Sequence, residues 1–219
     1  MKRGRKVEKK PHLGIDEAGR GSAIGPLVVC GFSMQEGDLP LLASLPLADS
    51  KVLSPAVRER LAAALRQMPA RIRLVKYPAS RVDQAVARNG LNSLEISAMV
   101  GLIRGVKPII TYIDALTSNP RRFGMQVEAL VAPLRAGIVA ENKADTKYPL
   151  VQAASILAKV ARDAVIAGLR VRYGDFGSGY PGDLKTRMFL TRFVEKNDFP
   201  RCVRRSWATI SRLSSPEHS

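Results

Sequence analysis

The most informative segment of this chain is Leu13–Gly21, which reads LGIDEAGRG. Its apolar start is typical of a buried strand, and its Gly-Arg-Gly end is typical of a turn. Two adjacent carboxylates, Asp16 and Glu17, separate the two parts, although acidic residues are poor strand formers and are seldom buried. A hard divalent cation would explain both acids, because Mg²⁺ and Mn²⁺ prefer carboxylate oxygens. The alternative is a solvated turn with a surface ion pair.

The end of this segment carries a second signal. Gly19 and Gly21 would let the backbone approach a ligand closely, and Arg20 between them would meet a phosphate. Together with the acids, this turn indicates a site for a phosphorylated or nucleic-acid ligand.

The composition narrows the class of partner. The chain has 219 residues with 46% hydrophobic content, enough for one large domain or a domain with an appendage. Its 35 Lys and Arg against 19 Asp and Glu leave a formal charge of +16, which favours a polyanionic partner, above all nucleic acid. No apolar run is long enough to span a membrane, and the basic N-terminus has no signal core, so we expect a cytoplasmic protein without a membrane partner.

The sequence lacks the residues that several other kinds of catalytic or binding site require. The two histidines, His12 and His218, lie near the termini, so histidine triads and zinc sites are incomplete. There is no GxxxxGK[ST] phosphate loop and no dinucleotide fingerprint. Cys30 and Cys202 match no metal-ligand spacing, and reduced thiols are the simpler interpretation.

Hydrophobic periodicity and turn residues predict an α/β protein with a helical C-terminal part. We expect a basic arm at 1–11, a catalytic domain at 12–175, and a C-terminal loop, helix and basic tail at 176–219. Ser54 and Ser80 are expected to cap two of the helices. The predicted strands cover 13–17, 27–34, 71–77, 108–114 and 137–141. The predicted helices cover 55–68, 80–89, 91–104, 120–131, 149–173 and 183–196.

Two further acids occupy positions like that of Asp16. Asp114 ends an apolar strand, and Asp145 lies just before a long helix. Carboxylates at the ends of separate strands can meet at the carboxyl edge of an α/β sheet. Such carboxylates would repel one another unless cations neutralised their charge. Two divalent ions would do so and would also supply the chemistry of phosphodiester hydrolysis.

Six segments, in this order along the chain, resemble the ribonuclease HII family, and the pattern is most similar to archaeal single-chain members. The resemblance covers roughly residues 13–190. The six segments are GIDEAGRG at 14–21, DSK at 49–51, YIDA at 112–115, ADTKYP at 144–149, AASILAKVARD at 153–163 and GSGYP at 177–181.

The resemblance implies a ribonuclease H-like fold, in which helices flank a central mixed sheet. It also implies the reaction that the protein catalyses. The family hydrolyses RNA in RNA/DNA hybrids and cuts 5′ of ribonucleotides embedded in duplex DNA, by two-metal catalysis that leaves 3′-OH and 5′-phosphate ends. By position, the four catalytic, metal-binding acids are Asp16, Glu17, Asp114 and Asp145, and the ions are Mg²⁺ or Mn²⁺. The residues that match the family's substrate contacts are Gly19, Arg20, Gly21, Lys51, Ser155, Lys159 and Tyr180.

Each substrate contact has a simpler alternative. Ser155 and Lys159 are neighbours on the polar side of the predicted helix 149–173, which by itself indicates only a solvated face. Lys51 would ordinarily be a surface lysine, and Tyr180 could pack under its loop. The resemblance instead implies that all four residues contact the substrate, with Tyr180 stacking at the RNA-to-DNA junction.

Some residues depart from that pattern or are assigned to structure. The family commonly has proline after Gly-Arg-Gly, whereas this chain has Ser22-Ala23, which leaves the rigidity of the loop open. Trp207 is expected to anchor the C-terminal segment rather than to stack on bases. The acids assigned to structure are Glu95, Asp163 and Asp175.

The leading hypothesis is therefore a monomeric, metal-dependent endonuclease acting on RNA/DNA hybrids and on ribonucleotide-containing duplex DNA. The alternatives are a catalytically silent nucleic-acid-binding protein and a DNA junction nuclease of the same broad fold. The type III relatives usually carry an extra N-terminal domain, for which the eleven residues before the first strand leave no room. The sequence leaves open whether a sliding clamp is a partner.

Overall fold

The structure of the protein is a computed structural model that describes residues 10–47, 53–194 and 198–213. Its chain forms two compact units, each assembled from three separate stretches. The first unit comprises Met1–Asp16, Gly31–Arg73 and Met99–Ile156. The second comprises Glu17–Cys30, Leu74–Ala98 and Leu157–Ser219.

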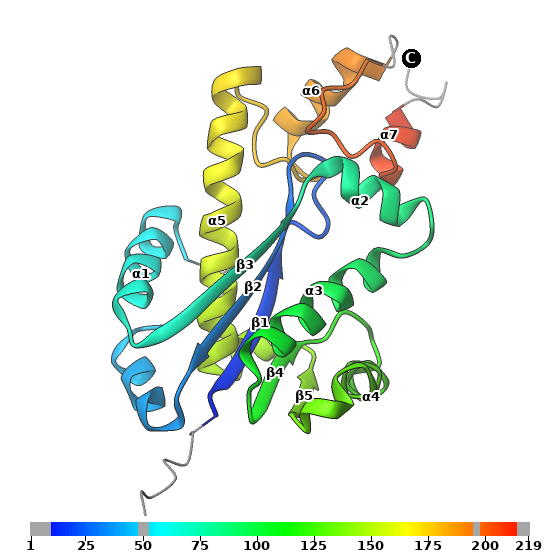
Figure 1. The fold of residues 1–219 in the computed structure, drawn as a ribbon. Helices are drawn as coiled ribbons and strands as arrows, with labels where there is room; N and C mark the ends of the chain where they lie inside the picture. The colour runs from blue at the N-terminus through cyan, green and yellow to red at the C-terminus, as the bar shows by residue number, and fades with distance from the viewer. Residues whose placement is uncertain (1–9, 48–52, 195–197, 214–219) are drawn as a thin grey trace, which may run out of the picture. The chain divides into compact units, whose positions relative to one another are not determined.

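The chain forms a mixed five-stranded sheet with the strand order β3-β2-β1-β4-β5, and most of the strand residues belong to the first unit (Figure 1). The central strand β1 pairs in parallel with β4, and β4 pairs in parallel with β5. The parallel pairs place the carboxyl ends of β1, β4 and β5 at the same edge of the sheet. The strands are β1 (His12–Ala18), β2 (Leu27–Met34), β3 (Ala70–Tyr77), β4 (Ile110–Asp114) and β5 (Gly137–Glu141).

The helices follow the predicted pattern closely. Ser54 caps α1 by accepting a hydrogen bond from the Val57 backbone nitrogen, as predicted. The prediction that Ser80 is a cap was wrong, because α2 begins at Ala79 and Pro78 takes the cap position. The helices are α1 (Pro55–Gln67), α2 (Ala79–Val86), α3 (Leu91–Val106), α4 (Pro120–Val131), α5 (Pro149–Tyr173), α6 (Leu184–Val194) and α7 (Ala208–Leu213), with the 3₁₀ helices η1 (Glu36–Ser44), η2 (Ala132–Leu134) and η3 (Ala144–Thr146).

Four of these elements were not predicted: the 3₁₀ helices η1, η2 and η3, and the helix α7. The sequence was read as a loop where η1 forms and as a basic tail where α7 forms. With proline at position 40 and only six residues in α7, neither segment shows a helical period long enough to recognise.

Close backbone contact fixes the start of α5 against β1. A Cβ atom on Gly14 would lie 2.3 Å from the carbonyl carbon of Leu150, a distance that no side chain tolerates. The flanking strand residues Leu13 and Ile15 and the helix residue Val151 are fully buried. Gly14 therefore lets the first turn of α5 rest directly on the strand that carries Asp16.

The second unit has its own apolar core. Phe176, Phe189 and Phe199 belong to it, together with Ile24 from the segment after β1 and Val203 near the C-terminus. A backbone bridge pairs Ile24 with Val203 in antiparallel fashion. The C-terminal segment is thus part of the fold of this unit, in direct contact with the segment that follows Gly21.

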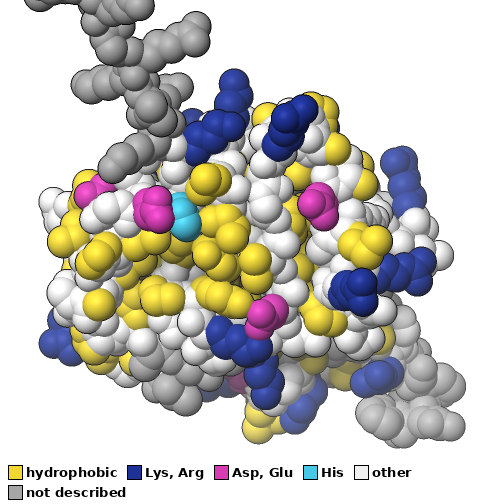
Figure 2. All heavy atoms as spheres, turned by 90° about the horizontal axis from the view of Figure 1, so that it is seen from below, with side chains coloured by type: hydrophobic (Ala, Val, Ile, Leu, Met, Phe, Trp, Pro, Cys, Tyr) yellow, Lys and Arg dark blue, Asp and Glu magenta, His cyan; other side chains and the backbone are white. Residues whose placement is uncertain are grey.

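Basic side chains are scattered over the surface. On the face shown in Figure 2, hydrophobic side chains occupy the middle and Lys and Arg side chains lie mostly toward the margin. No helix of the described residues is long and apolar enough to cross a membrane.

Candidate functional site

Asp16 and Asp114 lie at the ends of two adjacent strands. Ile15 of β1 pairs with Ile113 of β4 in parallel register, so the two aspartates occupy the next positions along the pair. Asp16 is only 4% exposed. The sheet therefore brings these two acids to one edge, as the sequence predicted.

Asp145 reaches the same edge through the connection after β5. It lies in η3, is 2% exposed, and follows Ala144, whose backbone nitrogen donates a 3.1 Å hydrogen bond to Asp114 Oδ1. Lys143, in the left-handed backbone region, turns the chain into η3. A turn and a backbone hydrogen bond thus tie the Asp145 segment to Asp114.

The third strand of this edge ends in an acid with a different environment. Glu141 pairs in register with Asp114, but its carboxylate accepts hydrogen bonds from Lys147 Nζ and, at 2.7 Å, from the Tyr148 hydroxyl. Both hydrogen bonds lower the pKa of Glu141. The hydrogen bond between the Tyr148 hydroxyl and Glu141 also raises the pKa of Tyr148 to about 12. Glu141 is therefore held by local partners.

The donor chemistry at this edge fits a hard divalent cation. Carboxylate oxygens from Asp16, Asp114 and Asp145 belong to one unit, and Glu17 follows Asp16 directly in β1. Over residues 10–47, 53–194 and 198–213, no three His, Cys, Asp or Glu side chains are already grouped closely enough to hold a metal ion. The four-acid metal site thus stays a prediction, as does the role of Lys51, which lies outside the described residues.

The two glycines around Arg20 differ sharply. Gly19 has a φ of +85°, and a Cβ atom there would lie 2.5 Å from the Pro26 carbonyl oxygen and 2.7 Å from Arg162 Nε. A Cβ atom on Gly21 would meet nothing within 4 Å. The fold therefore requires glycine at position 19, whereas the space beside Gly21 is open.

Ser22 replaces the usual proline with a hydrogen-bonded turn. Its backbone nitrogen and its hydroxyl both donate to the Gly19 carbonyl oxygen, at 3.3 and 3.0 Å. Ser22 is fully buried, and the next two backbone nitrogens, those of Ala23 and Ile24, donate to the Gly179 carbonyl. The loop is therefore closed by hydrogen bonds that a proline could not donate.

The Arg20 side chain is engaged inside the second unit. Its Nη1 forms an ion pair with Glu95 Oε2, and its Nη2 donates a 2.6 Å hydrogen bond to Asn92 Oδ1. Burial raises the pKa of the Glu95 carboxyl, and the adjacent Arg20 opposes that shift. Glu95 is structural, as predicted, and it holds the guanidinium group that was expected to meet a phosphate.

Arg204 and Trp207 secure the same loop from the C-terminal segment. Arg204 is fully buried, donates from Nη1 to the Arg20 carbonyl at 2.9 Å and donates from Nε to the Gly25 carbonyl at 3.2 Å. Trp207 donates from Nε1 to the Gly21 carbonyl at 3.3 Å. Burial lowers the pKa of Arg204 to about 10, so its guanidinium remains charged at neutral pH.

Arg162 links this loop to the one that carries Tyr180. The Arg162 guanidinium lies 4.6 Å from the centre of the Tyr180 ring and donates to the Ser178 carbonyl at 3.0 Å. Tyr180 is 37% exposed, so the alternative of a tyrosine packed beneath its loop is wrong. Burial lowers the pKa of Arg162.

Sequence reasoning missed Asn92, Arg162 and Arg204. Arg162 does lie in the family-like segment 153–163, and that was the only available signal. Arg204 contacts Arg20 across 184 positions of the chain, a separation at which no local pattern operates.

The first turns of α5 are more buried than the polar residues on one side of this helix indicate. Ser155 has no exposed surface, whereas Lys159 is partly exposed. The alternative of a solvated face at Ser155 is therefore wrong, because α5 is covered on nearly all sides there, whereas the role of Ser155 as a substrate contact stays a prediction. Of the two, Lys159 is the side chain that solvent reaches.

Comparison with known proteins gives a consistent answer. The family model described as Ribonuclease HII matches residues 13–210. A ribonuclease HII of Methanocella arvoryzae is 44% identical over 200 residues, which cover 90% of this chain and 88% of the relative.

Solved structures agree. The ribonuclease HII in a PCNA complex from Archaeoglobus fulgidus superimposes with a TM-score of 0.85 at 40% identity, covering 93% of this chain and 97% of the other. Bst-RNase HIII in complex with Mn²⁺ superimposes with a TM-score of 0.74 at 17% identity, covering 95% of this chain and 70% of the other, and so shares the fold. The predicted ribonuclease H-like α/β fold is confirmed. The matched length, the archaeal relatives and the shared fold together show that this chain belongs to the ribonuclease HII family and is a ribonuclease H.

Proposed function

We propose that this ribonuclease H cuts the phosphodiester on the 5′ side of a ribonucleotide, in RNA/DNA hybrids and in duplex DNA that contains a single ribonucleotide. The products would be 3′-OH and 5′-phosphate ends. We further propose that Asp16, Glu17, Asp114 and Asp145 hold two divalent ions, Mg²⁺ or Mn²⁺. Support comes from the oxygen donors gathered at the carboxyl edge of β1 and β4.

Bound ions would supply an activated water and stabilise the leaving oxygen. The chain's own contribution is the fixed placement of the carboxylates. Asp16 is set by the contact of Gly14 with α5, and Asp114 is set by its hydrogen bond from the Ala144 nitrogen. Because both acids are held in the backbone of the sheet, binding of the cations would require movement of their side chains rather than of the strands.

The Gly19–Gly21 loop would recognise the ribonucleotide. Arg162 and Arg204 are buried beside this loop. Arg162 Nη1 lies 3.9 Å from Asp163 Oδ1 and Arg20 is paired with Glu95, so these three arginines face two carboxylates. This excess of buried positive charge favours an anion, such as a phosphate, at the loop. The 2′-hydroxyl distinguishes RNA from DNA, and the backbone of the loop would read it at close range.

One observation carries this assignment: the space beside Gly21 is open although the loop around it is tightly bonded. Folding alone does not require glycine there, and Gly37 is equally open. What sets Gly21 apart is its place in the turn that directly follows the acids of β1, where close approach of a ligand is the physical reason that we propose for it.

The test replaces glycine by alanine at two open positions. We expect Gly21→Ala to lower kcat/KM on a duplex with one ribonucleotide by about 10²-fold, since small displacements at a reacting centre are costly. The melting temperature should stay close to that of the parent protein. Gly37→Ala, which also places its Cβ in open space, is the matched control and should change neither property. Full activity in Gly21→Ala would contradict the assignment.

The same substrate separates the alternatives. A silent binding protein would bind this duplex without cutting it at any divalent ion concentration. A junction nuclease would cut branched DNA and ignore the ribonucleotide. A sliding clamp remains a proposed partner, by analogy with the Archaeoglobus fulgidus relative solved with PCNA, and co-elution of the two purified proteins would test it. We also propose that the enzyme acts as a monomer, which light scattering would check.

A further inference from the structure

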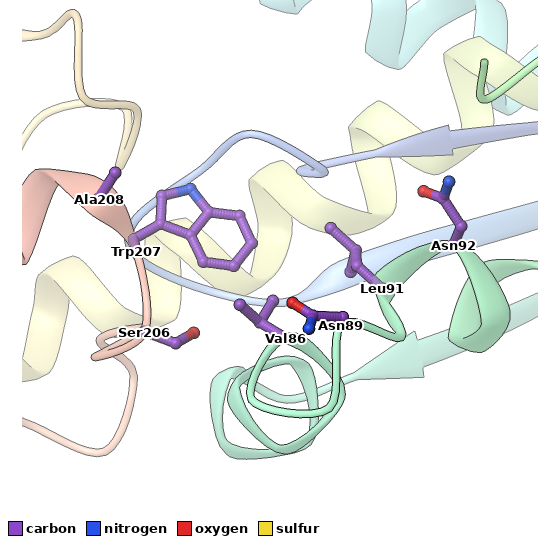
Figure 3. Close-up of a pocket in the computed structure, with 7 residues that line it drawn as sticks. All are labelled: Val86, Asn89, Leu91, Asn92, Ser206, Trp207 and Ala208. Atoms are coloured by element: carbon purple, nitrogen blue, oxygen red, sulfur yellow. The ribbon is translucent and has the colours of Figure 1, made fainter.

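A pocket of about 470 Å³ opens beside the Gly19–Gly21 loop, within the second unit (Figure 3). Two of its walls come from the end of α2 and the start of α3, and the third comes from the segment that leads into α7. The lining residues are Val86, Asn89, Leu91, Asn92, Ser206, Trp207 and Ala208.

Trp207 is the one aromatic residue among those that line this pocket, and its ring is held in place. Figure 3 shows the indole pointing toward Val86 and Leu91. Its Nε1 donates to the Gly21 carbonyl at 3.3 Å, and the buried Arg204 guanidinium lies 4.8 Å from the ring centre. The indole is thus a fixed aromatic surface joined directly to the proposed reading loop, so the predicted anchoring role is only part of its contribution.

Amide groups border the apolar part of the pocket. Asn92 accepts a hydrogen bond from Arg20 through Oδ1, and its amide nitrogen donates no hydrogen bond within the described residues. Asn89 is exposed and has a φ of 51°, in the left-handed region that asparagine tolerates. Ser206 is bound to Asp83 through its backbone nitrogen and its hydroxyl, at 3.0 and 2.6 Å, which fixes the third wall.

We propose that this pocket receives one base of the nucleic-acid substrate, next to the ribonucleotide read by the loop. The proposal rests on the proposed function. A nucleobase has a flat apolar face that matches the indole and an edge of donors and acceptors that matches the two amides. Arg20 beside the pocket is paired with Glu95, and Arg204 is buried, so their positive charge would attract the phosphates that flank such a base through the electrostatic field rather than by contact.

The pocket would then act together with the loop. Because Trp207 contacts Gly21 and Asn92 contacts Arg20, a base seated in the pocket would fix the position of the neighbouring sugar relative to the loop. Stacking on an aromatic side chain ordinarily changes affinity by about tenfold.

The chain contains a single tryptophan, so its fluorescence reports on the pocket directly. Duplexes with one ribonucleotide are bound in Ca²⁺, and a label on the DNA measures binding independently by anisotropy. In a series of duplexes, one base at a time near the ribonucleotide is removed to leave an abasic sugar. We expect binding to quench Trp207 emission, and one abasic position to abolish the quenching and weaken binding about tenfold.

Variants separate stacking from folding. Trp207→Leu should bind the intact duplex about tenfold more weakly and lose the penalty for the abasic position, whereas Trp207→Phe should keep most of that penalty. Asn89→Gly removes the amide at an exposed position and suits the positive φ, so it should weaken binding by a smaller factor while the melting temperature and the intrinsic emission stay close to those of the parent protein.

Two results would overturn the proposal in distinguishable ways. A duplex that binds by anisotropy without changing Trp207 emission, and with no sensitive abasic position, would refute the base pocket alone. A duplex that does not bind at all would refute the proposed function, and the pocket assignment with it.

Discussion

The acids at the carboxyl edge of the sheet and the Gly19–Gly21 loop are held by different kinds of contact. Asp16 and Asp114 lie near the carboxyl ends of a parallel strand pair, and the Asp145 segment is tied in by one backbone hydrogen bond. The loop is instead held by buried charged side chains, above all Arg204 and Glu95, from distant parts of the chain. The comparison teaches that the proposed chemistry depends on the backbone of the sheet, whereas the proposed selectivity depends on long-range polar contacts.

The largest effect on stability is expected at the glycine beneath the acids. Gly14→Ala would place a Cβ within 2.3 Å of the Leu150 backbone, so β1 and α5 must separate. We expect a loss of about 3 kcal/mol or more in the free energy of unfolding, at the upper end of the cost of overpacking a core. Urea denaturation measures it.

The control lies on α3 of the same unit. Gly101 has nothing within 4 Å of its Cβ position, and Gly101→Ala should stabilise the helix by up to about 1 kcal/mol. If Gly14→Ala were as stable as the parent protein, the account of how Asp16 is positioned would be wrong.

A smaller effect is expected where the loop is held by charge. Glu95→Gln leaves Arg20 without its counter-ion, and because the Arg20 side chain is 33% exposed we expect a loss of about 1–3 kcal/mol, less than for a fully buried pair. Asn92→Ala removes the neutral partner and should cost about 1 kcal/mol or less. Equal unfolding free energies for the two variants would contradict the leading role of the buried ion pair.

The smallest effect concerns the loop that carries Tyr180, and it depends on pH. Asp183 accepts hydrogen bonds from the Ser178 and Lys185 backbone nitrogens, and these bonds lower its pKa below the ordinary value of 3.8. Since the folded pKa is depressed, the stabilisation is complete above pH 3.8 and is lost as the pH falls through the lower, folded value.

Asp183→Asn should therefore melt at a lower temperature than the parent protein near pH 7. That difference should shrink toward zero in strong acid. Scanning calorimetry across this pH range makes the measurement, and a difference independent of pH would show that the carboxylate charge has no part in holding the loop.

The difference between the acids at the sheet edge and the Gly19–Gly21 loop also decides how much of each could be predicted from the sequence. The strands that carry Asp16 and Asp114 and the helix that begins at Pro149 were predictable, because apolar runs and proline are local signals. The hold of Arg204 on the Arg20 carbonyl was not, since it joins residues 184 positions apart. Burial of Ser155 also escaped prediction, because the wheel of α5 shows its polarity but not what covers it.

The most direct test uses one duplex with a single ribonucleotide, incubated with Mg²⁺ and with Mn²⁺. The parent protein should cut once, on the 5′ side of the ribonucleotide. Asp145→Asn should bind the duplex with similar affinity but cut it at least about 10²-fold more slowly, since even indirect partners of a metal site cost that much. Glu128→Gln, at an exposed position of α4, is the control and should cut normally. Unchanged cleavage by Asp145→Asn would contradict the four-acid site at the centre of this account.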